Sequence, residues 1–357
     1  MTPFKLERMG VIMEPKAGDA NEVEGVLNPA AARGRDGQLY LFPRLVAKGN
    51  YSRIGIARVL FDKSGDPTGV ERMGVVLEPE AEYELAPDGR GGCEDPRITY
   101  VEHRGHYVMT YTALSPHGPR IAIATSDDLF HWTRIGLAKF HPYKGISFDG
   151  VDDKDASVFP ALVPDPSGQP SVALLHRPFF PGTLPTETVE PSVPAPASSA
   201  LESIWIAYWH MDPDTNLPRS TEFVAHRLLA GPQSPWEKLK IGGGAPPILC
   251  RHGWLLVYHG VQEAAGSTPA KRKFIYSAGV MVLSEERPDR ILYRSPSPVL
   301  APETPQELEG VVSGVVFPTG IDRRDDLGQP DRFDVYYGMA DDRIGVARLQ
   351  VPETLPT

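Results

Sequence analysis

An internal repeat is the sequence feature that most constrains the fold. Five segments rich in aromatic and β-branched residues, each typical of a β-strand, recur at spacings of roughly 65–80 residues. Each is followed by a second strand-like segment, in which small residues alternate with β-branched ones. Each is preceded by a segment, proline-containing in every repeat, that we expect to form a turn. The leading strands are predicted at 38–46, 106–114, 171–179, 253–261 and 333–341, and the turns at 28–33, 94–99, 154–162, 243–249 and 314–320.

The length of the repeat decides between architectures. It is longer than the roughly 40–50 residues of common propeller blades, which favours four-stranded sheets joined by long loops around an axis. The 34 glycines and 37 prolines among 357 residues argue against long helices. We therefore predict an all-β fold, a five-bladed β-propeller formed by a single domain over residues 1–357. A large β-sandwich and a solenoid remain as alternatives.

One segment interrupts the repeat. Residues 181–200 are rich in proline, serine, alanine and threonine and contain few large apolar side chains. Such a composition buries too little apolar surface to offset its ordering entropy, so we expect an exposed insertion in the third repeat. A lid or an oligomer contact is the functional alternative.

Charge and apolar content limit the partners. The formal net charge is −10 and the sequence has no basic block, so we expect no nucleic-acid partner. No stretch approaches the roughly 18 apolar residues of a membrane span, and the first residues lack the apolar run of a signal peptide. We expect a cytoplasmic protein without a membrane partner, and a homo-oligomer remains open. Cys93 and Cys250 are expected to be buried, inert thiols.

Polar residues concentrate in the segments that a propeller would bring to its axis. Carboxylates, cations and hydrogen-bond donors gathered there would suit a polyol ligand, with aromatic rings available for stacking. We expect no metal, because the acidic run at 149–155 lacks the calcium-loop pattern. The candidate residues are Asn28, Arg44, Glu94, Asp95, Arg97, Asp152, Asp153, Lys154, Asp155, His176, Arg177, Tyr258, His259, Asp341 and Asp342.

Six segments, in order along the chain, resemble glycoside hydrolase family 130. That family contains β-mannoside phosphorylases and a smaller set of β-1,2-mannosidases, and its fold is a five-bladed propeller. The segments are GCEDPRIT (92–99), KDASVFP (154–160), LLHRP (174–178), GGGAPPI (242–248), LVYHGV (256–261) and YYGMADDRIGVA (336–347).

The resemblance implies a role for each matching residue. Asp95 falls on the family's general acid, which protonates the glycosidic oxygen through the 3-hydroxyl of the bound mannose. Inorganic phosphate, a co-substrate rather than a cofactor, attacks the anomeric carbon from the opposite face with inversion. The implied phosphate-binding residues are Arg44, Lys154, His176, Arg177 and Tyr258, and the implied sugar-binding residues are Asn28, Arg97, Asp155, His259 and Asp341.

The same residues bear on the type of reaction. An inverting hydrolase needs a second carboxylate to activate water, whereas a phosphorylase needs an anion site, for which arginine supplies a two-pronged donor. No glutamate falls inside LLHRP or LVYHGV, although Glu202, Glu222 and Glu263 lie close in sequence. We therefore predict an inverting β-mannoside phosphorylase, acting on a β-mannoside oligosaccharide or disaccharide. An inverting β-1,2-mannosidase, another five-bladed glycosidase with two or three carboxylates, and a non-catalytic carbohydrate-binding propeller are the alternatives.

Overall fold

A computed structural model describes residues 3–180, 202–211, 222–268, 272–329 and 331–356. The predicted insertion at 181–200 lies outside the described residues. The described part is built from β-strands with a few short helical turns, which confirms the predicted all-β class. None of its helices has the length and apolar character needed to cross a membrane. The helical turns are η1 (Glu82–Glu84), η3 (Pro235–Glu237), α1 (Pro305–Leu308) and η4 (Asp325–Leu327).

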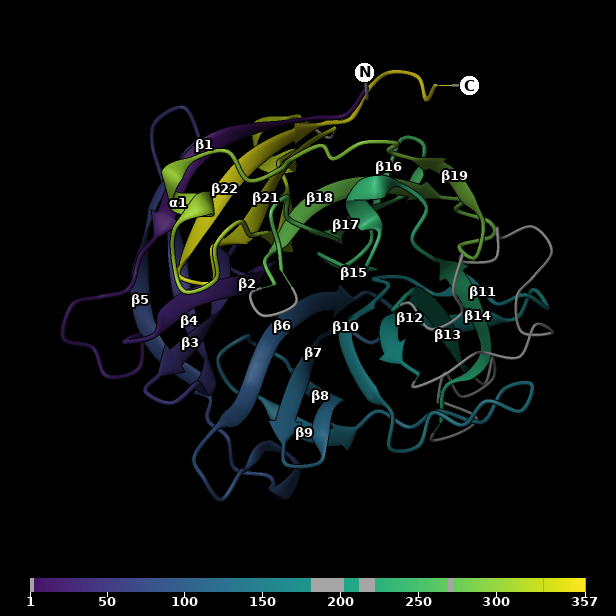
Figure 1. The fold of residues 1–357 in the computed structure, drawn as a ribbon. Coiled ribbons are helices and arrows are strands. Elements are labelled where there is room, and N and C mark those ends of the chain that lie inside the picture. Colours follow the sequence, from purple (N-terminus) through teal and green to yellow (C-terminus); the bar gives the residue numbers. More distant parts are fainter. Residues whose placement is uncertain (1–2, 181–201, 212–221, 269–271, 330, 357) are drawn as a thin grey trace.

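Among the described residues, the strands form five antiparallel groups that follow one another along the chain (Figure 1). The first two groups are joined into one sheet only by the short parallel pairing of Tyr51 and Ser52 with Gly91 and Gly92. The first group is β2 (Gly25–Arg33), β3 (Leu39–Ala47), β4 (Tyr51–Phe61) and β5 (Pro67–Leu77). The second is β6 (Gly91–Val101), β7 (His106–Ser115), β8 (Gly118–Ser126) and β9 (Thr133–Leu137).

The remaining three groups repeat this order, and two of them carry one extra short strand. The third is β10 (Asp152–Val158), β12 (Pro170–Phe179), β13 (Ile204–His210) and β14 (Val224–Ala230), with β11 (Val163–Pro164). The fourth is β15 (Lys240–Gly243), β17 (Gly253–Glu263), β18 (Phe274–Leu283) and β19 (Ile291–Arg294), with β16 (Ile248–Cys250). The fifth is β20 (Val316–Arg323), β21 (Arg332–Met339), β22 (Arg343–Gln350) and β1 (Lys5–Met13).

The fifth group is completed by the N-terminal strand. β1 pairs with β22 from Lys5 opposite Gln350 to Met13 opposite Ile344, so the two ends of the chain lie in one sheet (Figure 1). The pairing makes β22 an inner strand and β1 the edge strand of this sheet. This pairing has no local signal in the sequence, and we did not predict it.

The predicted strands are confirmed, but the predicted turns at 28–33, 94–99 and 314–320 are wrong. These three segments lie largely in the first strand of their group, because a proline at a bulge does not end a strand. The ladder slips between Leu27 and Ala30 in β2, and between Glu94 and Arg97 in β6. It slips again between Lys154 and Ser157 in β10. In the third and fourth groups the predicted turn is correct in part, because the first strand ends within it, at Val158 and at Gly243.

The apolar core is divided among the interfaces between neighbouring groups. Phe42 of the first group packs in one cluster with Met109 of the second. Further clusters join the second group to the third, the third to the fourth and the fourth to the fifth. One more cluster joins the fifth group back to the first, through Tyr336 and Leu41.

A buried glutamate recurs just before the first strand of three groups. Glu84 in η1 accepts hydrogen bonds from the hydroxyl of Tyr111 on β7 at 2.5 Å and from Nε of Arg134 on β9 at 2.9 Å. Glu237 makes the same pair of contacts with Tyr258 and Arg294, and Glu307 does so with Tyr337 and Arg8. Each glutamate also accepts backbone N–H groups three and four residues earlier. The set ties the helical turn to two strands of its own group.

Candidate active site

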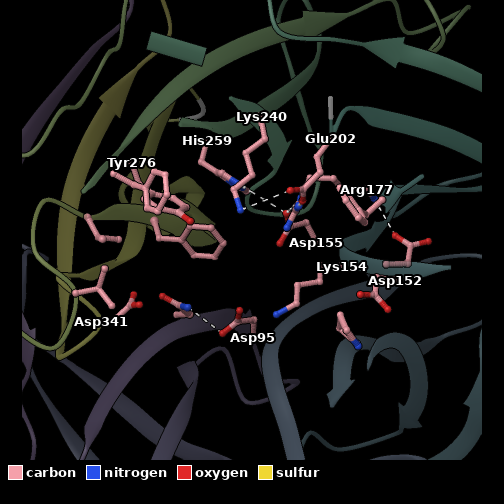
Figure 2. Close-up of a pocket in the computed structure, with 18 of the residues that line it drawn as sticks. Asp95, Asp152, Lys154, Asp155, Arg177, Glu202, Lys240, His259, Tyr276 and Asp341 are labelled. Atoms are coloured by element: carbon pink, nitrogen blue, oxygen red, sulfur yellow. Dashed lines mark hydrogen bonds and ion pairs between the residues drawn. The ribbon is translucent and has the colours of Figure 1, made fainter. Parts of the chain in front are cut away.

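A cavity of about 480 Å³ opens where the bulged parts of the first strands converge (Figure 2). Its wall combines six carboxylates, four cations and a set of aromatic rings. The charged and polar lining residues are Asn28, Arg44, Asp95, Asp152, Asp153, Lys154, Asp155, Arg177, Glu202, Lys240, His259 and Asp341. The aromatic lining residues are Phe179, Phe274, Tyr276 and Phe317.

The bulges explain why three of the predicted site residues line this cavity. Asn28, Asp95 and Asp155 have φ values of 44°, 46° and 57°. Asn and Asp are the residues that, after glycine, best tolerate this left-handed conformation. Each lies where its ladder slips, so the strand turns that side chain away from the regular alternation. The local sequence therefore places an Asx side chain on the cavity wall in three groups.

Asp95 lies among cations and a donor amide. Its Oδ1 accepts from Nδ2 of Asn28 at 2.8 Å and from Arg44 at 3.4 Å. Burial raises the pKa of the Asp95 carboxyl, but the charges of Arg44, Arg97 and Lys154 outweigh it and hold that pKa below its ordinary value. In these surroundings, the side chain of Asp95 is therefore an ionised carboxylate at neutral pH.

Glu94 links two of the predicted phosphate-binding cations. Its carboxylate accepts from Arg44 at 2.7 Å and from Nζ of Lys154 at 3.4 Å. The glutamate is 2 % exposed, so it holds the side chains of both cations in place from the protein interior. Neighbouring residues on β6 thus supply a buried anchor, Glu94, and a cavity-facing carboxylate, Asp95.

Asp155 is the centre of a second ionic cluster across the cavity. Its carboxylate accepts from Nε of Arg177 at 2.5 Å and from Arg97 at 3.3 Å, and lies 3.6 Å from Nε2 of His259. Burial raises the pKa of Asp155, but Arg177, His259 and Arg97 lower it overall. A Cβ on Gly242 would overlap the Asp155 carboxylate, which explains the glycine at the start of GGGAPPI.

Two more predicted sugar-binding residues lie in or behind this cluster. Burial lowers the pKa of His259 to about 3 despite the nearby Asp155 carboxylate, so the imidazole is neutral. Its ring centroid lies 4.5 Å from that of Phe317 on the cavity wall. Arg97 is 1 % exposed and does not line the cavity. Its guanidinium donates hydrogen bonds to the backbone carbonyls of Asp95 and Gly244. It therefore affects the cavity indirectly, by positioning Asp95 and Asp155.

His176 and Tyr258, for which the resemblance implies phosphate contact, do not line the cavity. Nδ1 of His176 lies 2.7 Å from the Asp153 carboxylate, and its ring stacks on Phe140 at a centroid distance of 4.6 Å. Tyr258 is fully buried, and its hydroxyl donates to Glu237 at 2.6 Å. Tyr258 thus belongs to the repeated glutamate–tyrosine–arginine set, whose members in the other groups do not line the cavity either.

This placement predicts the effect of Tyr258→Phe. The change removes one hydrogen bond to buried Glu237, so we expect the free energy of unfolding to fall by roughly 1–2 kcal/mol. The KM for phosphate should stay within twofold of that of the natural protein. Denaturant unfolding and steady-state kinetics measure the two effects, and Tyr111→Phe is the matched control in the second group. A large rise in the phosphate KM for Tyr258→Phe, without one for Tyr111→Phe, would show that Tyr258 takes part in phosphate binding.

Two charged residues of the cavity, Lys240 and Glu202, are not among the candidate residues from the sequence. Lys240 at the start of β15 lies two residues before the GGGAPPI segment, which was its only local signal. Burial and the charge of Arg177 lower the pKa of Lys240 to about 8, although Asp155 raises it. Glu202 was noted only as a glutamate close to a motif. It forms ion pairs with Arg177 and, at 3.9 Å, with Lys240.

Asp341 faces Asp95 and Arg44 from the end of β21. Burial raises the pKa of its carboxyl to about 6, since the nearby Asp95 and Glu94 charges add to burial while Arg44 opposes it. The folded protein therefore binds a proton between about pH 4 and pH 6 that the unfolded chain has released. This contribution to stability is fully present below pH 4 and is lost as the pH rises through 6.

Asp341→Asn tests that shift. The amide cannot ionise, so the variant should match the natural protein in melting temperature near pH 4. It should become the more stable of the two as the pH rises to 7, by up to about 3 kcal/mol. Thermal melts at half-unit pH steps measure the difference. A difference in melting temperature that stays constant from pH 4 to 7 would mean that the carboxyl titrates at its ordinary pKa.

No group of three or more His, Cys, Asp or Glu side chains in the described ranges is arranged to hold a metal ion. The absence of a metal in the reaction stays a prediction. Cys93 and Cys250 are free and buried, away from the cavity lining.

Comparison with known proteins gives consistent matches over the chain. A family model described as beta-1,4-mannooligosaccharide phosphorylase matches residues 6–165 and 219–356. A 1,2-beta-oligomannan phosphorylase of Thermoanaerobacter sp. (strain X514) is 30% identical, over 98% of this chain and 99% of its own. A beta-1,2-mannobiose phosphorylase from Listeria innocua, solved with beta-1,2-mannobiose, superposes with a TM-score of 0.68 at 22% identity, covering 97% of this chain and 96% of its own.

A further solved structure with a similar fold comes from a group that includes hydrolases. It comes from a family described as mannoside phosphorylases that contains glycoside hydrolases targeting beta-1,2 mannosidic linkages. It superposes with a TM-score of 0.67 at 23% identity, over 99% of this chain and 95% of its own. At these identities the solved structures establish the fold alone.

Proposed function

This chain belongs to glycoside hydrolase family 130, and from that premise we propose that it is an inverting β-mannoside phosphorylase. It would transfer a mannosyl group from a β-mannoside to inorganic phosphate, giving α-mannose 1-phosphate. The observation that carries the proposal is the pairing of Asp95 with four cations in one cavity: Arg44, Lys154, Arg177 and Lys240. Arginine and lysine provide the charge-assisted donors that a phosphate needs.

The charge balance of the cavity supports an acid role for Asp95. Arg44 and Lys154 hold the pKa of Asp95 low, together with Arg97. A phosphate bound to Arg44 and Lys154 would offset their charge, so the pKa of Asp95 would rise when both substrates are present. The acid would then be protonated only when phosphate is in place.

We infer the following balanced reaction. Protonated Asp95 donates its proton through the mannose 3-hydroxyl to the glycosidic oxygen, and the bond from that oxygen to the anomeric carbon breaks. A phosphate oxygen bonds to the same carbon from the opposite face. The proton that phosphate releases as this bond forms restores the acid. Asn28, Asp155, His259 and Asp341 would bind the sugar, with Arg97 positioning Asp95 and Asp155 from behind.

We also propose that the five strand groups close into a single five-bladed propeller. The core clusters between all consecutive groups, including the fifth and the first, support this arrangement. The β1–β22 pairing supports it as well. A cytoplasmic location would suit phosphorolysis, since the charged product sugar is retained inside a cell.

A second candidate is an inverting β-mannosidase, and Glu202 is the observation that favours it. An inverting hydrolase uses a second carboxylate to activate water, and Glu202 supplies one on the cavity wall opposite Asp95 (Figure 2). Its ion pair with Arg177 weighs against this role, because a general base needs a free lone pair directed at water.

Incubation with β-1,2-mannobiose and β-1,4-mannobiose, each with and without inorganic phosphate, tests the proposal. The relative matched over nearly its full length is a 1,2-beta-oligomannan phosphorylase, so we expect turnover of the β-1,2-linked sugar. Turnover should require phosphate with either sugar. Equal rates of cleavage with and without phosphate would show that the protein is a mannosidase and not a phosphorylase.

A further inference from the structure

Glu202 is an acidic side chain that contacts two cations expected to bind phosphate. One oxygen forms an ion pair with Nη1 of Arg177, and the other lies 3.9 Å from Nζ of Lys240. All three residues line the cavity (Figure 2). We propose that the carboxylate of Glu202 competes with phosphate for Arg177 and Lys240. This competition would set the affinity of the enzyme for phosphate. The inference rests on the proposed phosphorylase function.

The backbone holds Glu202 at this place. Its carbonyl accepts a hydrogen bond from the N–H of Ile241 at 3.1 Å, and it pairs in a parallel bridge with Lys240. The residue stands two positions before β13 and beside β15, and these backbone contacts fix its main chain. Its carboxylate is therefore delivered to the same cations in each molecule.

Of the two carboxylates on Arg177, Glu202 is the one that phosphate can displace. Asp155 has a side chain 2 % exposed and is held by Arg177, Arg97 and His259. The Glu202 side chain is 23 % exposed, and its ion-pair partners among the described residues are Arg177 and, at the limit of an ion pair, Lys240. Removing Asp155 from its partners would leave a deeply buried charge, which costs much more than releasing a partly exposed glutamate into water.

Competition of this kind lowers the apparent affinity for phosphate. The apparent dissociation constant is the intrinsic one divided by the fraction of molecules in which the cations are available. A partly exposed ion pair is worth roughly 1 kcal/mol, so its removal corresponds to a factor of about three to ten. Glu202→Gln keeps the shape of the side chain and removes the competing charge.

Calorimetric titration with inorganic phosphate tests the proposal, with the phosphate KM measured beside it. Glu202→Gln should bind phosphate about three- to tenfold more tightly than the natural protein. Glu263→Gln is the matched control, because it makes the same charge change at a residue paired with Arg272 outside the cavity lining. Its phosphate affinity should be unchanged. Glu202→Asp keeps the charge on a shorter side chain, and should give an intermediate affinity.

The outcomes separate this inference from the proposed function. Phosphate binding that is unchanged or weaker in Glu202→Gln, with an unchanged melting temperature, would overturn the inference and leave the phosphorylase standing. If Glu202→Gln does not fold, the same comparison is made with Glu202→Asp, where unchanged affinity would overturn it. Phosphate-independent mannose release that disappears in Glu202→Gln would make Glu202 the base of a hydrolase and overturn both. A natural protein that binds no phosphate at all would overturn the proposed function first.

Discussion

Asp95→Asn is expected to slow phosphorolysis by roughly 10²- to 10⁴-fold, the usual contribution of a positioned general acid. The amide still accepts the hydrogen bond from Asn28, so the fold and the cavity should persist. It cannot donate a proton to the departing oxygen, so the loss should fall on kcat. The KM for phosphate should change little, since the four cations remain.

Initial rates of mannose 1-phosphate formation at saturating phosphate measure this effect. Asp88→Asn is a suitable control, because Asp88 is an exposed aspartate paired with Arg90 outside the cavity lining. A substrate with a more acidic leaving group needs less proton donation, so it should recover much of the rate in Asp95→Asn. A kcat within a fewfold of normal on the natural substrate would assign the acid to another residue.

Arg177→Ala is expected to raise the phosphate KM by roughly 10- to 100-fold. Each charge-assisted hydrogen bond to an anion is worth about 1.5–3 kcal/mol, and this change removes the fork that could make two. The KM for the mannoside should rise less, because Asp155 keeps Arg97 and His259 as partners. The change therefore acts unequally on the two substrates.

Separate KM values for phosphate and mannoside, each at saturating co-substrate, measure this selectivity. Arg272→Ala removes an arginine whose side chain is 53% exposed and should leave both values unchanged. Because Arg177 also neutralises buried Asp155, a thermal melt must accompany the kinetics. Equal increases of the two KM values in a folded variant would show that Arg177 holds the cavity together and has no special part in binding phosphate.

The strands could be predicted from the sequence because alternation of apolar residues is a local property. The first strands of the first two groups could not, since Pro29 and Pro96 are typical of turns. In both cases the proline follows an Asx residue in a left-handed conformation, which together form a bulge inside a strand. The same two-residue signature predicted two residues that line the cavity, Asn28 and Asp95, and the wrong secondary structure around them.

Asp95, Arg44 and Asp155 line the cavity and could be proposed from the sequence because each lies in a segment of the repeat, whereas the lining residues Lys240 and Glu202 lie just outside those segments. Tyr258 shows why the rest could not. Its neighbour His259 lines the cavity, but successive side chains of a strand point to opposite faces, so Tyr258 points into the packing between groups. Its partner Glu237 ends a Ser-Pro-Trp-Glu capping box, a local signal that would have identified a structural role.

The central claim is that phosphate, and not water, takes the mannosyl group. Its most direct test follows the products of β-1,2-mannobiose cleavage by phosphorus and proton NMR in phosphate buffer. The account predicts one α-mannose 1-phosphate and one free mannose for each bond broken, with the α-anomer formed first and no cleavage when phosphate is withheld. Two free mannose molecules for each bond broken, at a rate independent of phosphate, would contradict it.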